Sequence, residues 1–240
     1  MDMQSNDVVD MVGHDCAWAA ELMQKRRNNY ASYSPVFWHQ SPKAKSLHVE
    51  SLHHQIVREN IIARRTGHGF IIAELRHLQG FVDDFAVDED SRWDDEGREL
   101  LFNSWHGLIA KGATSLTIVS AKRDEAKNRL IDSVGLSLIQ QWWVKSVMPT
   151  GDDKRQDGPI DDKGFNGYLG PTPPIYDPGG SVLLVRDIKD KTSLEDIEKQ
   201  GSRWGAVLIV VSQTPNSPRI GELEKKGYEV APEWFAGKPS

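Results

Sequence analysis

The chain has 240 residues, enough for one large domain or two small ones, and a formal net charge of −6. This acidic balance disfavours nucleic acid as the main partner, because phosphate binding needs a basic surface. The longest apolar runs, such as residues 207–211, are far shorter than the ~20 residues of a membrane helix, so we expect no membrane partner. The first residues, MDMQSNDVVD, are acidic and lack an apolar signal core, which predicts a cytoplasmic protein.

Apolar spacing predicts two helices at the start, over residues 15–30 and 46–60, with the aromatic loop YASYSPVFWHQSP between them. A hairpin follows, in which IIARR and FIIAELR flank the turn at residues 66–69. The strand GFVDDFAV, residues 80–87, then leads into an acidic loop. We expect a helix over residues 96–111, the strand SLTIVS, a helix ended by glycine, and the strand LSLIQQWWV.

The second part of the chain differs in composition. Residues 148–180 are rich in Gly, Pro and Asp, which predicts a linker. Residues 181–240 then predict a strand, a helix, a strand, a helix and a strand.

This order suggests an internal repeat. A shift of 92 positions, the separation of Ser120 and Ser212, also places Gly227 on Gly135. The same gap-free shift places Trp234 on Trp142. We therefore interpret residues 181–240 as a shortened second copy of a strand–helix–strand unit.

Cysteine and histidine show no metal-binding pattern. Cys16 is the single cysteine, so an internal disulfide and a cysteine-based zinc cage are both excluded. His48, His53 and His54 lack the i, i+4 spacing of a helical zinc site. We therefore expect no bound metal.

The first copy resembles the GNAT-type N-acetyltransferases over about residues 10–147, mainly in its order of elements. That family's pyrophosphate motif, Gln/Arg-x-x-Gly-x-Gly/Ala, falls on residues 92–97, where Arg92 and Gly97 match its ends and Asp95 replaces its middle glycine. The layout also resembles an uncharacterised group of bacterial GNAT-like proteins.

The resemblance implies an α/β (α+β) fold with a mixed, mostly antiparallel sheet and flanking helices. Residues 1–147 would form the acetyl-CoA-binding domain, and residues 148–180 the linker. Residues 181–240 would form a degenerate half-domain of βαβαβ order. This second copy lacks the glycine-bearing loop, so we expect it to cover a sheet edge of the first copy or to help form a homodimer.

In this family acetyl-CoA, the co-substrate, lies in a V-shaped cleft between the fourth and fifth strands. By position, the backbone of Phe85, Ala86 and Val87 would hold the pantetheine, and amides of the next loop would hold the pyrophosphate. That loop comprises Arg92, Trp93, Asp94, Asp95, Glu96, Gly97 and Arg98. Each acid at ~8 Å from a phosphate costs about 2 kcal/mol before screening, so we expect weaker acetyl-CoA binding than is usual for the family.

Acyl transfer needs a base that takes a proton from the substrate ammonium. Asp83 and Asp84 are the catalytic candidates. Adjacent strand residues face opposite ways, so only one of them can point into the cleft and act as the base, directly or through a water. The alternative is that neither is a base, one capping a neighbouring loop and the other being solvated. The family's thiolate-protonating tyrosine maps to Ile131, which cannot donate a proton.

The early aromatic loop falls where the substrate-side loop of this family lies. Tyr33, Phe37 and Trp38 could therefore line the acceptor pocket, and plain packing is the alternative.

Two functions remain open. The first is an acetyl-CoA-dependent N-acetyltransferase that acts by direct attack of a primary amine, on a small molecule or an amino terminus; Gly97 and Arg98 favour it. The second is a degenerate module that binds a ligand or partner without transferring an acyl group; Asp95 and Ile131 favour it.

Overall fold

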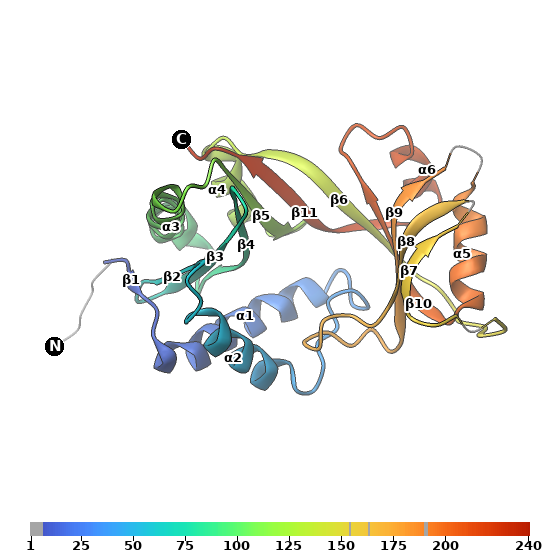
Figure 1. The fold of residues 1–240 in the computed structure, drawn as a ribbon, viewed down its shortest axis with the longest axis horizontal. Coiled ribbons are helices and arrows are strands. Elements are labelled where there is room, and N and C mark those ends of the chain that lie inside the picture. Colours follow the sequence, from blue (N-terminus) through green and yellow to red (C-terminus); the bar gives the residue numbers. More distant parts are fainter. Residues whose placement is uncertain (1–6, 154, 163, 190–191) are drawn as a thin grey trace. The chain divides into compact units, whose positions relative to one another are not determined.

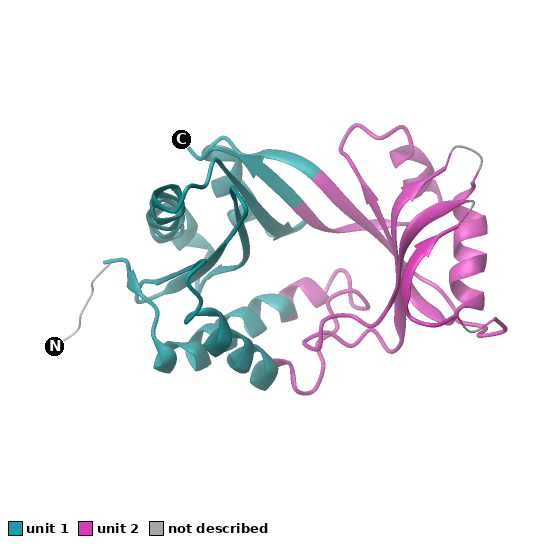
Figure 2. Cartoon of the chain, viewed as in Figure 1, with its two compact units in different colours: residues 1–27, 45–139, 234–240 teal, residues 28–44, 140–233 magenta. Residues whose placement is uncertain are grey.

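The computed structural model describes residues 7–153, 155–162, 164–189 and 192–240. These residues form two compact units, which Figure 2 shows in different colours. Unit 1 contains residues 1–27, 45–139 and 234–240, and unit 2 contains residues 28–44 and 140–233. Each unit therefore combines segments that are far apart in the sequence, which differs from the expected division at residues 147 and 180.

Unit 1 is a sheet flanked by helices (Figure 1). Its strands are β1 (Val9–Asp10), β2 (Ile61–Arg65), β3 (Gly69–Arg76), β4 (Gln79–Val87) and β5 (Ser115–Ala121), in that spatial order, followed by the end of β11 (Glu229–Gly237). Its helices are α1 (Cys16–Ala31), α2 (Ala44–Gln55), α3 (Arg98–Ala110) and α4 (Glu125–Ser133), with 3-10 turns η1 (Gly13–Asp15) and η2 (Asp90–Arg92) and the π-helical turn η3 (Trp93–Gly97). Strands β1 to β4 pair antiparallel, and β4 pairs with β5 in parallel.

The sheet of unit 1 has a hydrophobic core on each face, because successive strand residues point to opposite sides. Phe70 and Ile72 of β3 pack with α1 and α2, in the core that also contains the buried Cys16. Ile71 and Ala73 pack with α3 and α4. The four β3 residues alternate strictly, so the strand is fixed in register by burial on both sides.

Strand β4 carries a β-bulge at the two aspartates. The register of β3 with β4 shifts opposite Ile72, and Val82 and Phe85 both pack in the core beneath α3 and α4. The two residues between them, Asp83 and Asp84, are thereby left on the face of α1 and α2. The expectation that the aspartates face opposite ways is therefore wrong, because it assumed a regular strand.

Unit 2 repeats the strand pairing of unit 1. Its elements are β6 (Ser137–Ser146), β7 (Gly158–Asp161), β8 (Phe165–Gly170), β9 (Ser181–Ile188), α5 (Leu194–Arg203), β10 (Ala206–Gln213) and α6 (Ile220–Lys225). Strands β7, β8 and β9 pair antiparallel and β9 pairs with β10 in parallel, as β2 to β5 do in unit 1. The second copy is thus longer than the expected 181–240 half-domain.

Two of these strands, β7 and β8, lie in the segment that was expected to be a linker. Pro159 is tolerated because β7 is at the edge of the sheet, where a missing N–H costs no ladder bond. Gly167 in β8 is required because a Cβ there would collide with the carbonyl of Leu184 on β9, next to a register shift. In this segment glycine and proline are compatible with strand pairing, so the high Gly and Pro content is not evidence of a linker.

The 92-residue repeat is visible in the element bounds. Helix α4 ends at Ser133 and α6 at Lys225, and each helix is followed by a glycine with positive φ, +78° at Gly135 and +76° at Gly227. These glycines take the left-handed conformation that ends a helix.

The strand after each repeated helix continues into the other unit. From residue 140 onward β6 lies in unit 2, where it pairs with β10, whereas the end of β11 lies in unit 1, where Phe235 joins the core beneath α4. Each copy therefore receives part of a strand from the other.

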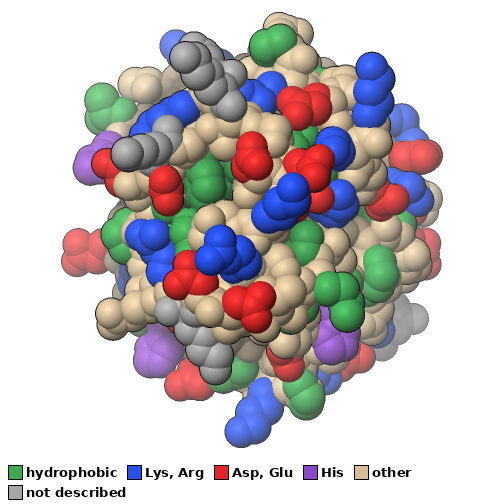
Figure 3. Space-filling model, turned by 90° about the vertical axis from the view of Figure 1, so that its right-hand side faces the viewer, with side chains coloured by type: hydrophobic (Ala, Val, Ile, Leu, Met, Phe, Trp, Pro, Cys, Tyr) green, Lys and Arg blue, Asp and Glu red, His purple; other side chains and the backbone are tan. Residues whose placement is uncertain are grey.

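Among the described residues, no helix is long and apolar enough to cross a membrane. The face drawn in Figure 3 carries Lys and Arg side chains interspersed with Asp and Glu, so that this face has no extended field of one sign.

Candidate active site in unit 1

Strands β4 and β5 separate at their carboxyl ends. Their described parallel pairs run from Gln79–Ser115 to Val82–Ile118, although β4 continues to Val87 and β5 to Ala121. A gap between the ends of parallel strands, beside helix α4, is the kind of opening in which α/β folds bind ligands. The backbone of Phe85, Ala86 and Val87 lies on the diverging part of β4.

Two buried cations bond to backbone carbonyls of the diverging strands. Arg26 of α1 donates to the Val87 oxygen at 3.3 Å and pairs with Asp124 at 2.5 Å, and its guanidinium lies 5.0 Å from the Trp93 ring centroid. Lys127 of α4 donates to the Val119 oxygen at 2.9 Å. The ends of both strands are therefore already engaged by side chains of the chain itself.

Lys127 is 3% exposed, and its ammonium is 5.5 Å from the centroid of the Phe85 ring. Burial, reinforced by the charge of Arg26, lowers the pKa of Lys127 to about 8, against the opposing effect of Asp124. An amine with this pKa is mostly protonated at neutral pH and can release its proton easily.

Asp84 is held by two partners from the helices on its face. His48 Nε2 of α2 is 2.8 Å from one carboxylate oxygen, and Arg27 Nη2 of α1 donates to the other at 3.1 Å. Burial alone would raise the pKa of Asp84, but the charge and hydrogen bond of His48 and the charge of Arg27 outweigh it and hold the pKa below its usual value. Asp84 is therefore a fixed anion and a poor proton acceptor.

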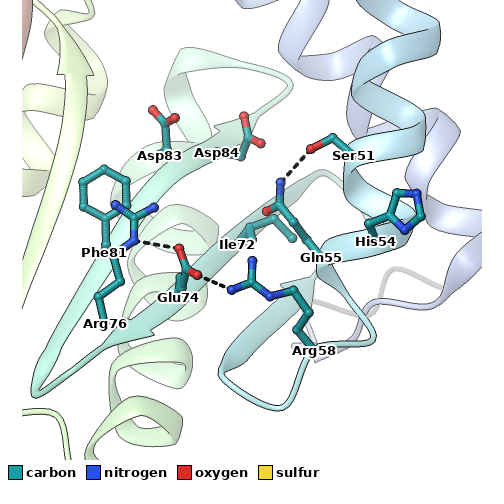
Figure 4. A pocket seen from close by; sticks show the side chains of 10 residues that line it. All are labelled: Ser51, His54, Gln55, Arg58, Ile72, Glu74, Arg76, Phe81, Asp83 and Asp84. Carbon is teal, nitrogen blue, oxygen red and sulfur yellow. Dashed lines mark hydrogen bonds and ion pairs between the residues drawn. The ribbon is translucent and has the colours of Figure 1, made fainter. Parts of the chain in front are cut away.

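A pocket of about 400 Å³ lies between α2, β3 and β4, and both aspartates line it (Figure 4). Asp83 is exposed in this pocket, and its carboxylate makes no hydrogen bond or ion pair with the described residues. Partial desolvation within the pocket and the charge of Asp84 raise the pKa of Asp83, and the solvent exposure of the side chain limits this effect. The bulge thus gives two adjacent carboxylates different properties.

The other end of the pocket is formed by two arginines that share one glutamate (Figure 4). Arg58 Nη2 donates to Glu74 at 2.6 Å and Arg76 Nε at 2.7 Å, while the Arg76 guanidinium stacks 3.9 Å from the centroid of the Phe81 ring. Burial would raise the pKa of Glu74, but the hydrogen bonds and charges of the arginines lower it, so Glu74 stays ionised. Two cations and one anion leave a net positive charge here.

The predicted pyrophosphate loop is folded as turns η2 and η3, and several of its side chains point inward. Trp93 is buried against Phe85 with ring centroids 4.8 Å apart, and Glu96 binds Thr66 at 2.6 Å and Arg92 at 2.7 Å. A Cβ on Gly97 would lie 2.8 Å from the Trp93 ring, so this glycine permits close packing of the turn.

The outer residues of the loop face water. Asp94 and Asp95 are exposed, and Arg98 Nη2 donates to the Ser133 hydroxyl at 2.8 Å. The assignment of this loop to a pyrophosphate stays a prediction, because the inward contacts explain Trp93, Glu96 and Gly97 without a phosphate.

The aromatic residues Tyr33, Phe37 and Trp38 lie in unit 2, and none of them lines the pocket that holds Asp83. Trp38 packs on Phe37 with ring centroids 4.9 Å apart and on Tyr176 at 5.9 Å. Tyr33 and Phe37 line a separate cavity of about 360 Å³ within unit 2. Their role in binding an acceptor also stays a prediction.

Sequence reasoning missed the charged residues that hold this site together: Arg26, Arg27, His48, Asp124 and Lys127. Arg26 and Arg27 lie within the predicted first helix, which continues to Ala31, and nothing in their spacing points to Asp84 or Asp124. A signal was present for Lys127, which lies on the buried stripe of α4 with Leu130 and Ile131. Among the described residues, no group of three or more His, Cys, Asp or Glu could hold a metal ion.

Comparison with solved structures relates the fold to one class of protein. The GCN5-related N-acetyltransferase from Sphaerobacter thermophilus matches with a TM-score of 0.59 and 11% identity, over 97% of this chain and 95% of that chain. A proposed acetyltransferase from Thermoplasma acidophilum matches with a TM-score of 0.56 and 13% identity, over 88% and 89%. A proposed acetyltransferase from Pyrococcus horikoshii matches with a TM-score of 0.52 and 10% identity, over 100% and 92%.

The chain therefore has the fold of the GNAT acetyltransferases: a mixed, largely antiparallel sheet with flanking helices. No protein-family model matches the sequence, and no curated protein matches it significantly.

Proposed function

We propose that unit 1 is an acetyl-CoA-dependent N-acetyltransferase that acylates a primary amine by direct attack, with Asp83 as the base. The observation that carries this proposal is the bulge in β4, which turns Asp83 into the α2–β3–β4 pocket at the point where β4 leaves β5. Asp84 is held by Arg27 and His48, whereas among the described residues the Asp83 carboxylate has no hydrogen bond or ion pair and its pKa is raised, so Asp83 is the better proton acceptor.

In the proposed reaction, Asp83 takes a proton from the substrate ammonium. The neutral nitrogen then forms a bond to the acyl carbon, the carbon–sulfur bond breaks, and its electron pair goes to sulfur. The nitrogen loses its second proton to solvent as the amide forms, and solvent returns a proton to Lys127 after that lysine has protonated the thiolate. Lys127, with a pKa of about 8, supplies the proton to the thiolate, whose own pKa is ~8.5. Lys127 would thus protonate the leaving thiolate, the role that the family's tyrosine has at the position of Ile131.

The buried cations bear on how acetyl-CoA would fit. The Val87 oxygen accepts from Arg26 and the Val119 oxygen from Lys127, so a pantetheine lying between the strands must replace or pass these bonds. Replacing a satisfied hydrogen bond yields little net free energy, so weak binding of acetyl-CoA is expected.

The same contacts favour a second function, a GNAT-fold module that binds a ligand without acyl transfer. In that case Arg26, Asp124 and Lys127 would close the separation of β4 and β5, and only the α2–β3–β4 pocket would bind a ligand.

Calorimetric titration of the full chain with acetyl-CoA separates the two functions. The transferase predicts saturable heat, and then release of CoA thiol when a panel of primary amines is added. Absence of heat and of a thermal shift at millimolar acetyl-CoA would contradict the transferase and leave the binding module.

A further inference from the structure

The α2–β3–β4 pocket is lined by two aspartates and, apart from them, by two arginines that share a glutamate (Figure 4). At one end are Asp83 and Asp84, of which Asp84 is already paired with Arg27 and His48. At the other end Arg58 and Arg76 share Glu74. The first end therefore offers the carboxylate of Asp83, and the second offers two guanidiniums around one carboxylate, which leaves it net positive.

The two ends remain unpaired with each other. No ion pair joins Asp83 to Arg58 or Arg76 among the described residues, although oppositely charged groups face the same cavity. Arg58 and Arg76 each donate one N–H group to Glu74. Their side chains are 49% and 53% exposed, respectively, so that their other N–H groups can reach a ligand. The rigid, planar guanidinium suits a carboxylate.

The floor of the pocket sets the distance between the ends. Ile72, Glu74 and Arg76 alternate along β3 and share its face, and Phe81, beneath the Arg76 guanidinium, is two residues from Asp83 on β4. Two strand residues span ~7 Å. A ligand that bridges these ends must carry its cation and anion only a few bonds apart.

We propose that this pocket binds a small zwitterion of the α-amino acid type, with its ammonium at Asp83 and its carboxylate at Arg76 and Arg58. This inference rests on the proposed function only in naming that zwitterion as the acyl acceptor. Asp83 selects the amine, and the arginine pair rejects amines that lack an anion near the nitrogen.

The test measures binding to the full chain by calorimetry without acetyl-CoA, using a panel of L-amino acids, their amides and their N-acetyl derivatives. The amino acid that binds best should do so at least tenfold more tightly than its amide, which lacks the carboxylate, and than its N-acetyl form, which lacks the ammonium. Equal binding of the amide would overturn the proposal. Absence of binding by every amino acid at about 10 mM would also overturn it, because a dissociation constant above that concentration is too weak for a specific site.

Variants assign the two ends. Arg76→Gln should weaken amino acid binding at least tenfold and leave amide binding unchanged, whereas Asp83→Asn should weaken both. Arg186→Gln, at an exposed residue of β9 in unit 2, is the matched control and should change neither. If Arg76→Gln weakened the amide as strongly as the amino acid, the arginine end would not recognise the carboxylate.

The two proposals fail separately. Zwitterion binding without any CoA release would contradict the transferase and retain this site. CoA release with amines and amides as readily as with amino acids would retain the transferase and contradict this site.

Discussion

At the scale of single residues, the pocket distinguishes two adjacent aspartates by their partners. Asp84 is tied to Arg27 and His48, whereas Asp83 faces the pocket. Asp83→Asn should lower kcat for acyl transfer by about 10²–10⁴-fold and leave thermal stability nearly unchanged, because it removes the base and no recorded internal contact. Steady-state kinetics and a thermal melt of the same preparation check both parts.

Asp84→Asn should instead lower the stability of the fold. It leaves the buried Arg27 without its carboxylate partner, which costs about 3–5 kcal/mol of unfolding free energy. The lowered pKa of Asp84 contributes stability above its ordinary value of 3.8, and this contribution is lost as pH falls below that value. Urea unfolding between pH 3 and 7 should therefore show less acid sensitivity in the variant; an equal pH dependence of both proteins would contradict this role.

Lys127 gives a prediction in alkaline solution. Its pKa is about 8 in the folded protein, against an ordinary value of 10.5, so between these values the unfolded chain binds more protons and stability rises with pH. In Lys127→Met this contribution disappears, and the unfolding free energy should rise less, or fall more, than in the wild type from pH 8 to 10. Parallel curves from chemical denaturation would show that Lys127 is not desolvated as described.

The two aspartates also show how far the sequence predicts the site. Their position on a strand beside a glycine-bearing turn was readable, because the apolar pattern of GFVDDFAV is that of a buried strand. Their orientation was not, since a bulge depends on how β4 pairs with β3. The partners Arg27 and His48 come from helices remote in the sequence, and only tertiary packing reveals them.

At the scale of elements, Gly97 matches the last position of a pyrophosphate motif in the sequence, but in the structure it allows the turn η3 to pack closely. A Cβ at this position would lie 2.8 Å from the Trp93 ring and 3.2 Å from Leu130. Gly97→Ala should therefore destabilise the protein by about 1–3 kcal/mol through overpacking. Gly221→Ala in α6 is the matched control, because nothing lies within 4 Å of its added Cβ, and it should be neutral or slightly stabilising. Chemical denaturation compares the two, and an equal effect would remove the packing explanation.

Elements of the second half show why composition misleads. Strand β7 contains a proline at the edge of the sheet, and β8 contains a glycine next to a register shift, which are positions where these residues are tolerated. Their amino-acid composition nevertheless resembles that of a linker. By contrast, the repeat of strand, helix and strand was predictable, because Gly135 and Gly227 mark two helix ends that need the same left-handed backbone.

At the scale of the whole molecule, the units do not follow the order of the chain. A fragment of residues 1–147 contains every predicted CoA-contacting residue, but it lacks residues 234–240 of unit 1, including Phe235. It also carries residues 28–44 and most of β6 without unit 2, to which they belong. We expect this fragment to melt at lower temperature than the full chain, or to be partly unfolded, by circular dichroism and limited proteolysis. A native-like fragment with the full chain's melting temperature would contradict this assignment.

Because β6 and β11 each continue from one unit into the other, changes in one copy also affect the other copy. A deletion at the C-terminus removes material from the unit that contains the candidate active site, and an altered β6 acts first on the other unit. Neither copy can therefore be discarded, recombined with a foreign domain or inherited separately without damage to its neighbour. We therefore expect a deletion within either copy to destabilise both units.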